Sequence, residues 1–243
     1  MMRFDTGQFL SSLARCTRFN PQNFSGDQLR KLPLCPGWNT FMRGLLGELY
    51  ALTGGLTMLL VRNPLIGAVA ATVAILLAHA WLTAGRENRL PLQFGKLLFP
   101  HATPDELRLR EQLIPAAVPL LLFLLVYSGG AYWLGAIFAF AAAGASTLSI
   151  PPRSHEEGTS VLADGGKTGW AVAVLFSFVT MALFFIASPV RHLHFVHAMA
   201  FSAFMVLIAP WLRHIPGRPA GFTANCLLCE VVGAVFALLA LAL

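Results

Sequence analysis

The stretch PLIGAVAATVAILLAHAWLTA, residues Pro64–Ala84, contains no charged side chain and is long enough to cross a lipid bilayer as a helix. About 20 apolar residues, at about 1.5 Å each, span the hydrocarbon core. Similar runs recur along the chain: Phe41–Val61, Leu113–Tyr127, Ala131–Ile150, Thr168–Ser188, Leu193–Leu212 and Phe222–Leu243. The sequence therefore predicts an all-α, polytopic integral membrane helical bundle with about seven transmembrane helices.

One of these runs is weaker than the others. Leu113–Tyr127 is short and contains Pro115 and Pro119. Proline removes a backbone hydrogen bond inside a helix and crowds the preceding turn. We therefore expect this element to be kinked or not to span the membrane fully.

The composition agrees with a membrane protein. Hydrophobic residues make up 56% of the chain and charged residues 12%, and the mean hydropathy is +0.67. These values exclude an ordinary soluble domain. The formal net charge of +6 fits topology and anionic lipid better than nucleic acid, because no basic helix with interleaved aromatic residues is present.

The positive charges predict the orientation. If the N-terminus is cytoplasmic, all of the 17 Lys and Arg residues except Arg62 and Arg191 fall on the cytoplasmic side, Arg43 among them. Positively charged segments resist translocation, so this bias sets topology. We expect a multi-pass protein of the bacterial inner membrane, with a cytoplasmic segment at 1–40, a helical membrane domain at 41–243 and the C-terminus outside.

The N-terminal segment has two interpretations. Gln8–Phe19 can form an interfacial helix with its apolar residues, including Cys16, turned to lipid, or it can be a disordered lead-in. Residues 1–20 lack the apolar core of a signal peptide. A reducing cytoplasmic side argues against structural disulfides among the cysteines.

Ionisable residues at membrane depth are costly and therefore mark candidate sites. Glu48 and Glu230 lie inside predicted spans, and His79 lies near the end of another. The other acidic residues gather mainly in the predicted loops Gly85–Gln112 and Pro151–Lys167. We expect a site where these two loops meet the helix ends, although for any single acid solvated loop charge is the preferred explanation.

Four local patterns are weighed against simpler explanations. The three histidines in His192–His197 resemble a metal cluster but lie at a predicted interface without a nearby carboxylate or cysteine. Cys226 and Cys229 form a CxxC inside an apolar helix, which favours packing over redox chemistry. Gly165–Thr168 resembles a P-loop without its first glycine, so we reject a nucleotide site. Arg153–Gly158 is a charged loop that can hold phosphate, metal or only solvent.

In order, these features resemble the cobalamin synthase family (adenosylcobinamide-GDP ribazoletransferase). Cys16–Pro21 is similar to the family's opening segment, and the glycine-rich Gly44–Gly47 follows in the first span. His79 stands where the family has a histidine before its acidic motif, and Glu156–Gly158 resembles an Arg-x-Glu-Gly-Leu-Gly segment. Gly221 matches the family's C-terminal Thr-Gly-Asp segment. The resemblance spans nearly the whole chain, through individually weak motifs.

The departures from this family are chemically important. Its signature Asp-Gly-x-Ala-Asp-Thr-x-Asp-Gly would place acids where this chain has Trp81, Gly85 and Asn88. Asp105 coincides with a family aspartate, whereas Phe222 replaces another. Carboxylates hold the Mg²⁺ that neutralises a pyrophosphate, so losing three of them should abolish that site.

The resemblance implies a site and a reaction. An active enzyme would join α-ribazole or its phosphate to GDP-activated cobinamide, with Asp105, Glu156 and Glu157 as catalytic residues and Mg²⁺ held by Asp105 and Glu157. Substrate would contact His79, Arg86, Arg89, Arg153 and Gly221. The missing carboxylates favour a noncatalytic relative that binds a corrinoid or another nucleotide-linked molecule without turnover, since arginine binds phosphate directly.

Two other classes of function stay open. A small-solute transporter would line its path with Glu48, Glu230 and the histidines, although no inverted repeat is detectable. A noncatalytic membrane subunit would pack through small residues such as Gly129, Gly130, Gly135 and Gly144, and an oligomer is compatible with either.

Overall fold

The computed structural model describes residues 6–20, 23–25, 36–84, 104–149 and 222–242. All regular structure in these ranges is helical, which confirms the all-α prediction for the described part of the chain. The helices are α1 (Thr6–Cys16), α3 (Pro36–Leu60), α4 (Pro64–Thr83), α6 (Pro104–Tyr127), α7 (Trp133–Ser149) and α10 (Phe222–Ala242). The predicted spans Thr168–Ser188 and Leu193–Leu212 lie outside the described residues.

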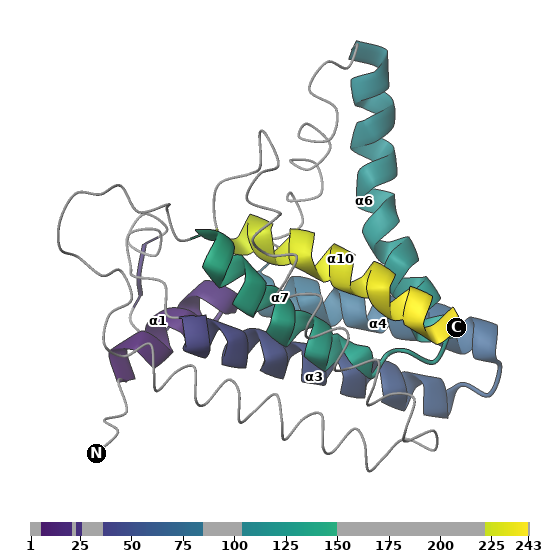
Figure 1. The fold of residues 1–243 in the computed structure, drawn as a ribbon. Helices are drawn as coiled ribbons and strands as arrows, with labels where there is room; N and C mark the ends of the chain where they lie inside the picture. The colour runs from purple at the N-terminus through teal and green to yellow at the C-terminus, as the bar shows by residue number, and fades with distance from the viewer. Residues whose placement is uncertain (1–5, 21–22, 26–35, 85–103, 150–221, 243) are drawn as a thin grey trace.

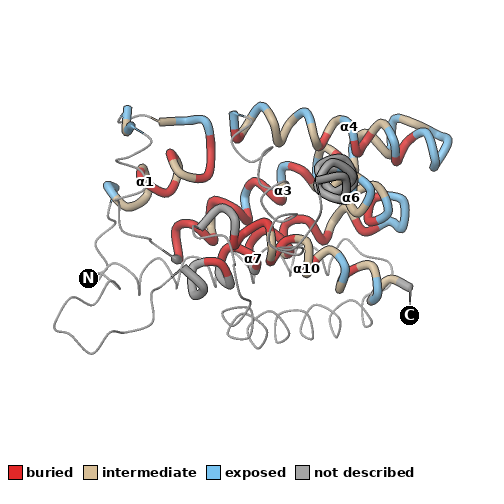
Figure 2. The backbone as a smooth tube through the Cα atoms, turned by 90° about the horizontal axis from the view of Figure 1, so that it is seen from above, coloured by how far each residue is buried: buried red, intermediate tan, exposed pale blue. Residues whose placement is uncertain are grey.

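Four of the helices lie side by side. Figure 1 shows α3, α4, α7 and α10 running in roughly the same direction, whereas α6 rises steeply from them and is seen end-on in Figure 2. Helix α7 packs against both α3 and α10, and α4 packs against α3. Helix α6 contacts α4 and α10.

The connection between α3 and α4 is a short hairpin turn. Asn63 caps α4: its side-chain oxygen accepts from the backbone N–H groups of Leu65 (3.0 Å) and Ile66 (3.1 Å). Pro64 follows as the first helical residue, where its missing N–H costs nothing. The cap and the proline together define the start of α4, and the helix ends at Thr83, one residue before the predicted boundary.

Helix α6 is longer than the apolar run that predicts it. It begins at Pro104 and continues to Tyr127 through Pro115 and Pro119, but its apolar part, Ala116–Tyr127, is short, in agreement with the expectation of an incomplete span at Leu113–Tyr127. The first part of α6 is charged, so a search for apolar runs cannot detect it. The chain then turns through Gly129, whose positive φ of 78° suits glycine, and enters α7.

Close packing of α3 against α7 depends on glycine. A Cβ on Gly47 would overlap the carbonyl oxygen of Leu134 and lie 2.9 Å from the Cα of Gly135. Small residues allow two helix backbones to approach in this way. The core beside this contact contains Leu46, Tyr50 and Ile137.

Helix α1 packs against the bundle instead of presenting its apolar residues to lipid. Phe9 makes an edge-to-face contact with Trp38 of α3 at 5.3 Å between ring centroids. Cys16 is 3% exposed and belongs to the same core as Cys226 and Cys229. The expectation that Cys16 faces lipid is therefore wrong, because Cys16 is buried in the core and Phe9 and Leu13 are partly buried against it. Beyond the helix, Arg18 lies over the exposed ring of Trp81, 4.7 Å from its centroid.

The outer surfaces of α3 and α4 are strongly apolar. Helix α4 is, by length and composition, the one helix in the described ranges that is long and apolar enough to cross a membrane. The exposed residues of α4 are pale blue in Figure 2. Large aliphatic residues repeat at helical spacing on the exposed faces of both helices: Leu45, Leu49, Leu52, Leu56, Leu59 and Leu60 on α3, and Leu65, Ile66, Val69, Val73 and Leu77 on α4. We call these residues the aliphatic stripe. Soluble monomers rarely expose an apolar surface of this extent.

Candidate functional site

A buried ion pair joins the first and last long helices of the described fold. The guanidinium of Arg43 on α3 lies 3.2 Å from a carboxylate oxygen of Glu230 on α10, and the two side chains are 1% and 9% exposed. The Arg43 guanidinium also lies over the ring of Phe138 on α7, 5.6 Å from its centroid. Removing two charges from water is expensive, so each charge here depends on the other.

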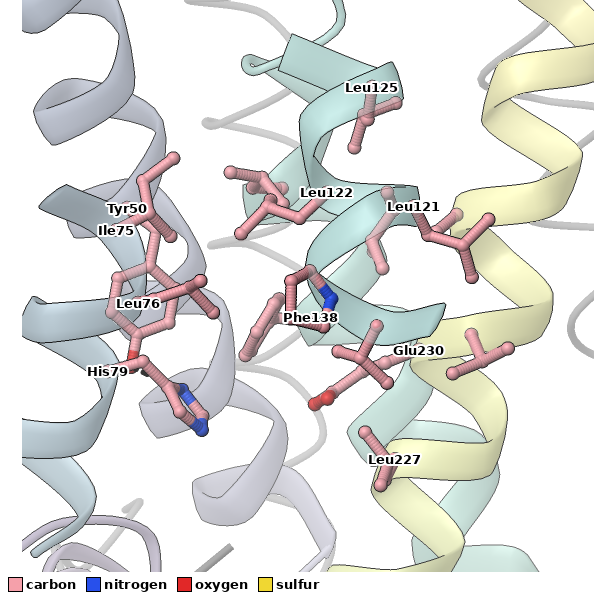
Figure 3. Close-up of a pocket in the computed structure, with 16 residues that line it drawn as sticks. Tyr50, Ile75, Leu76, His79, Leu121, Leu122, Leu125, Phe138, Leu227 and Glu230 are labelled. Atoms are coloured by element: carbon pink, nitrogen blue, oxygen red, sulfur yellow. Dashed lines mark hydrogen bonds between the residues drawn. The ribbon is translucent and has the colours of Figure 1, made fainter. Parts of the chain in front are cut away.

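A pocket of about 270 Å³ lies beside this pair. It is bounded by residues of α3, α4, α6, α7 and α10, most of them leucine, isoleucine, valine and alanine. Figure 3 shows Leu121, Leu122 and Leu125 of α6 above it and Leu227 of α10 below. Pockets for small molecules combine such an apolar lining with a few polar groups, and this one is close to the lower end of their usual range of roughly 300–1,000 Å³.

The polar groups of the pocket lie on two facing walls. On one wall, Nδ1 of His79 is 3.1 Å from the hydroxyl of Tyr50, and the two rings meet edge-to-face at 5.6 Å. On the other wall, the carboxylate of Glu230 points toward this pair across the pocket (Figure 3). The ring of Phe138 lies between them, 5.2 Å from that of Tyr50. A ligand in the pocket would therefore meet an imidazole, a phenol and a carboxylate.

Glu48 lies elsewhere. A Cβ on Gly135 would overlap the Glu48 carboxylate, which places that carboxylate in the contact between α3 and α7. One of its oxygens is buried and has no hydrogen-bond partner within the described residues. Of the residues predicted to line a transport path, Glu230 and His79 reach the pocket, whereas Glu48 is not among its lining residues.

The structure describes few of the residues implied by the family resemblance. His79 lies on the pocket wall, and Asp105 lies in the first turn of α6 as far as its backbone is described. Trp81, which stands at a family aspartate position, is exposed and stacked under Arg18. The remaining predicted site residues lie outside the described ranges: Arg86, Arg89, Arg153, Glu156, Glu157 and Gly221.

Most of the predicted metal ligands also lie outside the described residues. No group of three His, Cys, Asp or Glu side chains suited to a metal occurs in the described part of the chain. Glu157 and the histidines of His192–His197 lie outside it, and the side chain of Asp105 is not described. Cys226 and Cys229 are buried in the core, which agrees with the packing interpretation.

Sequence reasoning missed two residues of this site. Arg43 was assigned to the cytoplasmic charges, yet it is buried and paired with Glu230. Tyr50 is not among the predicted site residues, although Arg43 and Tyr50 are seven positions apart and therefore share one face of α3. A charge on the same helix face as an aromatic residue with a polar tip is the signal that identifies this face as an interior one.

Searches against protein-family models, curated proteins and solved structures find no match to this chain.

Proposed function

We propose that this chain is a multi-pass membrane protein that binds a small molecule inside its helical bundle. The aliphatic stripe supports the membrane environment, since leucines such as Leu59 and Leu60 are each 83% exposed. Lipid makes such a surface favourable, whereas water makes it costly. The distribution of Lys and Arg supports an inner-membrane orientation with about seven spans and a cytoplasmic N-terminus.

The observation that carries the binding function is the Arg43–Glu230 pair on the border of an apolar pocket. A buried ion pair is weak evidence for stability, because apolar residues of similar size often stabilise a fold as well or better. Ionisable residues within membrane helices typically face a bundle interior and mark ligand or ion paths. The pair therefore fits a role in binding. Such a site is compatible with a carrier and with a noncatalytic binding subunit.

Pocket occupancy tests this proposal without knowledge of the ligand. The full chain would be purified in lipid nanodiscs and released into a mass spectrometer under native conditions. We expect an adduct of defined mass on the wild type and on Val235→Phe, because Val235 is 41% exposed and is not among the pocket-lining residues. Ala234→Phe fills the pocket from the neighbouring position on α10 and should lose the adduct. An adduct present on all three proteins, or on none, contradicts binding at this pocket.

A ribazoletransferase-like activity is the second candidate. The position of His79 on the pocket wall favours it, because the resemblance implies a substrate-binding histidine there. In this reading Mg²⁺ would be held by Asp105 and Glu157, and Glu156 would assist catalysis. The assay combines adenosylcobinamide-GDP, α-ribazole phosphate and Mg²⁺ with the nanodisc protein and measures GMP release.

The three outcomes of this assay separate the candidates. GMP release that is lost in Glu157→Gln establishes a transferase. Saturable corrinoid binding without GMP indicates a noncatalytic relative. If neither GMP release nor corrinoid binding is observed, the family-based function is eliminated and the pocket is the site to pursue.

A further inference from the structure

The segment that follows α1 is attached to the end of α4. The backbone N–H of Arg18 donates to the carbonyl oxygen of Leu82, in the last turn of α4, and so pairs one of the carbonyl groups that a helix C-terminus leaves open. The hydroxyl of Thr17 donates to the carbonyl oxygen of Leu13 at 2.7 Å and accepts from the N–H of Phe19 at 3.1 Å. These bonds fix where Arg18 and Phe19 lie relative to α4.

The side chains of this segment gather around Trp81 on the surface. The guanidinium of Arg18 lies 4.7 Å from the centroid of the Trp81 ring, and the Phe19 ring meets that ring edge-to-face at 6.2 Å. Arg18 is exposed, and Phe19 and Trp81 are 50% and 57% exposed. Within the described residues no carboxylate pairs with Arg18. A guanidinium over an aromatic ring still presents N–H donors to an anion. We call Arg18, Phe19 and Trp81 the arginine–aromatic cluster.

The cluster lies at the end of an apolar line along α4. Exposed residues recur every four positions from Leu65 through Val69, Val73 and Leu77 to Trp81, and residues at this spacing lie one above the other on a helix. At about 1.5 Å per residue, the line from Leu65 to Trp81 rises about 24 Å, against a hydrocarbon core of about 30 Å. When α4 crosses a membrane, Trp81 therefore comes to the membrane–water interface, where tryptophan is enriched.

The predicted orientation puts this end of α4 on the cytoplasmic side. With the N-terminus inside, α3 leads outward to the turn at Arg62, and α4 returns inward toward Trp81. The cytoplasmic leaflet carries anionic lipids, which attract basic side chains near its surface. Arg18 thus provides a positive charge at the interface where negative headgroups are present.

We propose that the arginine–aromatic cluster binds an anionic phospholipid, with the phosphate at Arg18 and the acyl chains along α4 beside Leu77 and Val73. This inference uses the membrane environment of the proposed function and adds a lipid partner outside the pocket. A free phosphate ion would match the charge of Arg18 but would leave the apolar line uncovered. A zwitterionic lipid brings its own cation, which competes with Arg18 for the phosphate.

Lipid binding by the full chain tests the site. The purified protein in a non-ionic detergent would be titrated with phosphatidylglycerol or with phosphatidylcholine of the same acyl chains, and bound lipids would be counted by native mass spectrometry. We expect the wild type to bind phosphatidylglycerol about fivefold more tightly, the factor that corresponds to about 1 kcal/mol for one interfacial arginine. Inorganic phosphate should not displace the lipid. Equal binding of the two lipids, or displacement by inorganic phosphate, overturns the proposal.

Two exposed arginines at opposite ends of α4 provide matched variants. Arg18→Gln should remove the preference for phosphatidylglycerol, whereas Arg62→Gln removes the same charge at the turn before α4 and should retain the preference. Trp81→Leu should reduce the preference, because the Arg18 guanidinium loses the ring beneath it, and it replaces Arg18→Gln if that variant does not fold. The same loss in both arginine variants indicates a response to net charge alone and overturns the site.

The pocket variant Ala234→Phe separates this site from the pocket. It should leave phosphatidylglycerol binding unchanged, because Ala234 lines the pocket and the cluster residues are not among its lining residues. Loss of phosphatidylglycerol in Ala234→Phe would place the lipid in the pocket and overturn the surface site. A wild type that lacks a pocket adduct but selects phosphatidylglycerol through Arg18 contradicts binding at the pocket and supports the cluster.

Discussion

Replacing Gly47 by alanine tests the close contact between α3 and α7. The new methyl group would overlap the carbonyl oxygen of Leu134 and lie 2.9 Å from the Cα of Gly135. Both are backbone atoms of α7, so no side-chain rotation relieves the overlap and the helices must shift or separate. Overpacking of this kind costs about 1–3 kcal/mol.

Gly55→Ala is the matched control on the same helix. A Cβ at Gly55 meets nothing within 4 Å, so alanine there changes only the conformational freedom of the backbone. That change stabilises a helix by about 0.5–1 kcal/mol. The same gain accompanies Gly47→Ala, so the difference between the two variants isolates the packing cost of about 1–3 kcal/mol.

Unfolding in mixed detergent micelles, followed by far-ultraviolet circular dichroism, measures this difference. We expect Gly47→Ala to unfold at a lower denaturant fraction than Gly55→Ala. Gly135→Ala should lie between them, because its methyl group meets the flexible side chain of Glu48 instead of a backbone. If Gly47→Ala is as stable as Gly55→Ala, the two backbones are not in contact at this position and the packing of α3 on α7 is wrong.

Three further predictions concern the ion pair, a helix cap and the pocket wall. Arg43→Met or Glu230→Met alone should destabilise the fold by about 3–5 kcal/mol, whereas the double variant should recover most of that loss in the same titration; equal loss in all three contradicts the pairing. Asn63→Ala should cost about 1 kcal/mol by removing the cap of α4, and Asn63→Ser should restore most of it. Tyr50→Phe should cost about 0.5–1.5 kcal/mol and change the imidazole NMR signals of His79, and unchanged signals would count against their hydrogen bond.

In the described part of the chain, apolar runs predict a helix well where the whole helix is apolar. The run Pro64–Ala84 becomes α4 almost residue for residue, because apolar residues continue to its capped ends. Hydropathy fails where a helix continues into polar sequence. Helix α3 begins at Pro36 and α6 at Pro104, both before their predicted spans, since the uncharged polar residues at the start of α3 and the charged residues at the start of α6 lower the hydropathy without preventing helix formation.

The candidate site was harder to predict than the helices. Glu230 and His79 are conspicuous in the sequence because each is ionisable within an apolar run. Their partners, Arg43 and Tyr50, depend on how α3 meets α4 and α10 in space. The pairing joins helices from opposite ends of the chain, and helical periodicity within one segment carries no information about which segment lies opposite.

The burial of Arg43 also bears on the predicted orientation. Its charge was counted among those that keep the cytoplasmic side in place, but Glu230 neutralises it inside the bundle. An ion-paired residue contributes little to a charge bias that acts on loops during insertion. The charge bias remains without Arg43, because only Arg62 and Arg191 are predicted outside and all the other Lys and Arg residues are predicted on the cytoplasmic side. Arg62 lies in the turn between α3 and α4, so a reporter fused at this turn should be external. A cytoplasmic reporter there would contradict the predicted orientation of both helices.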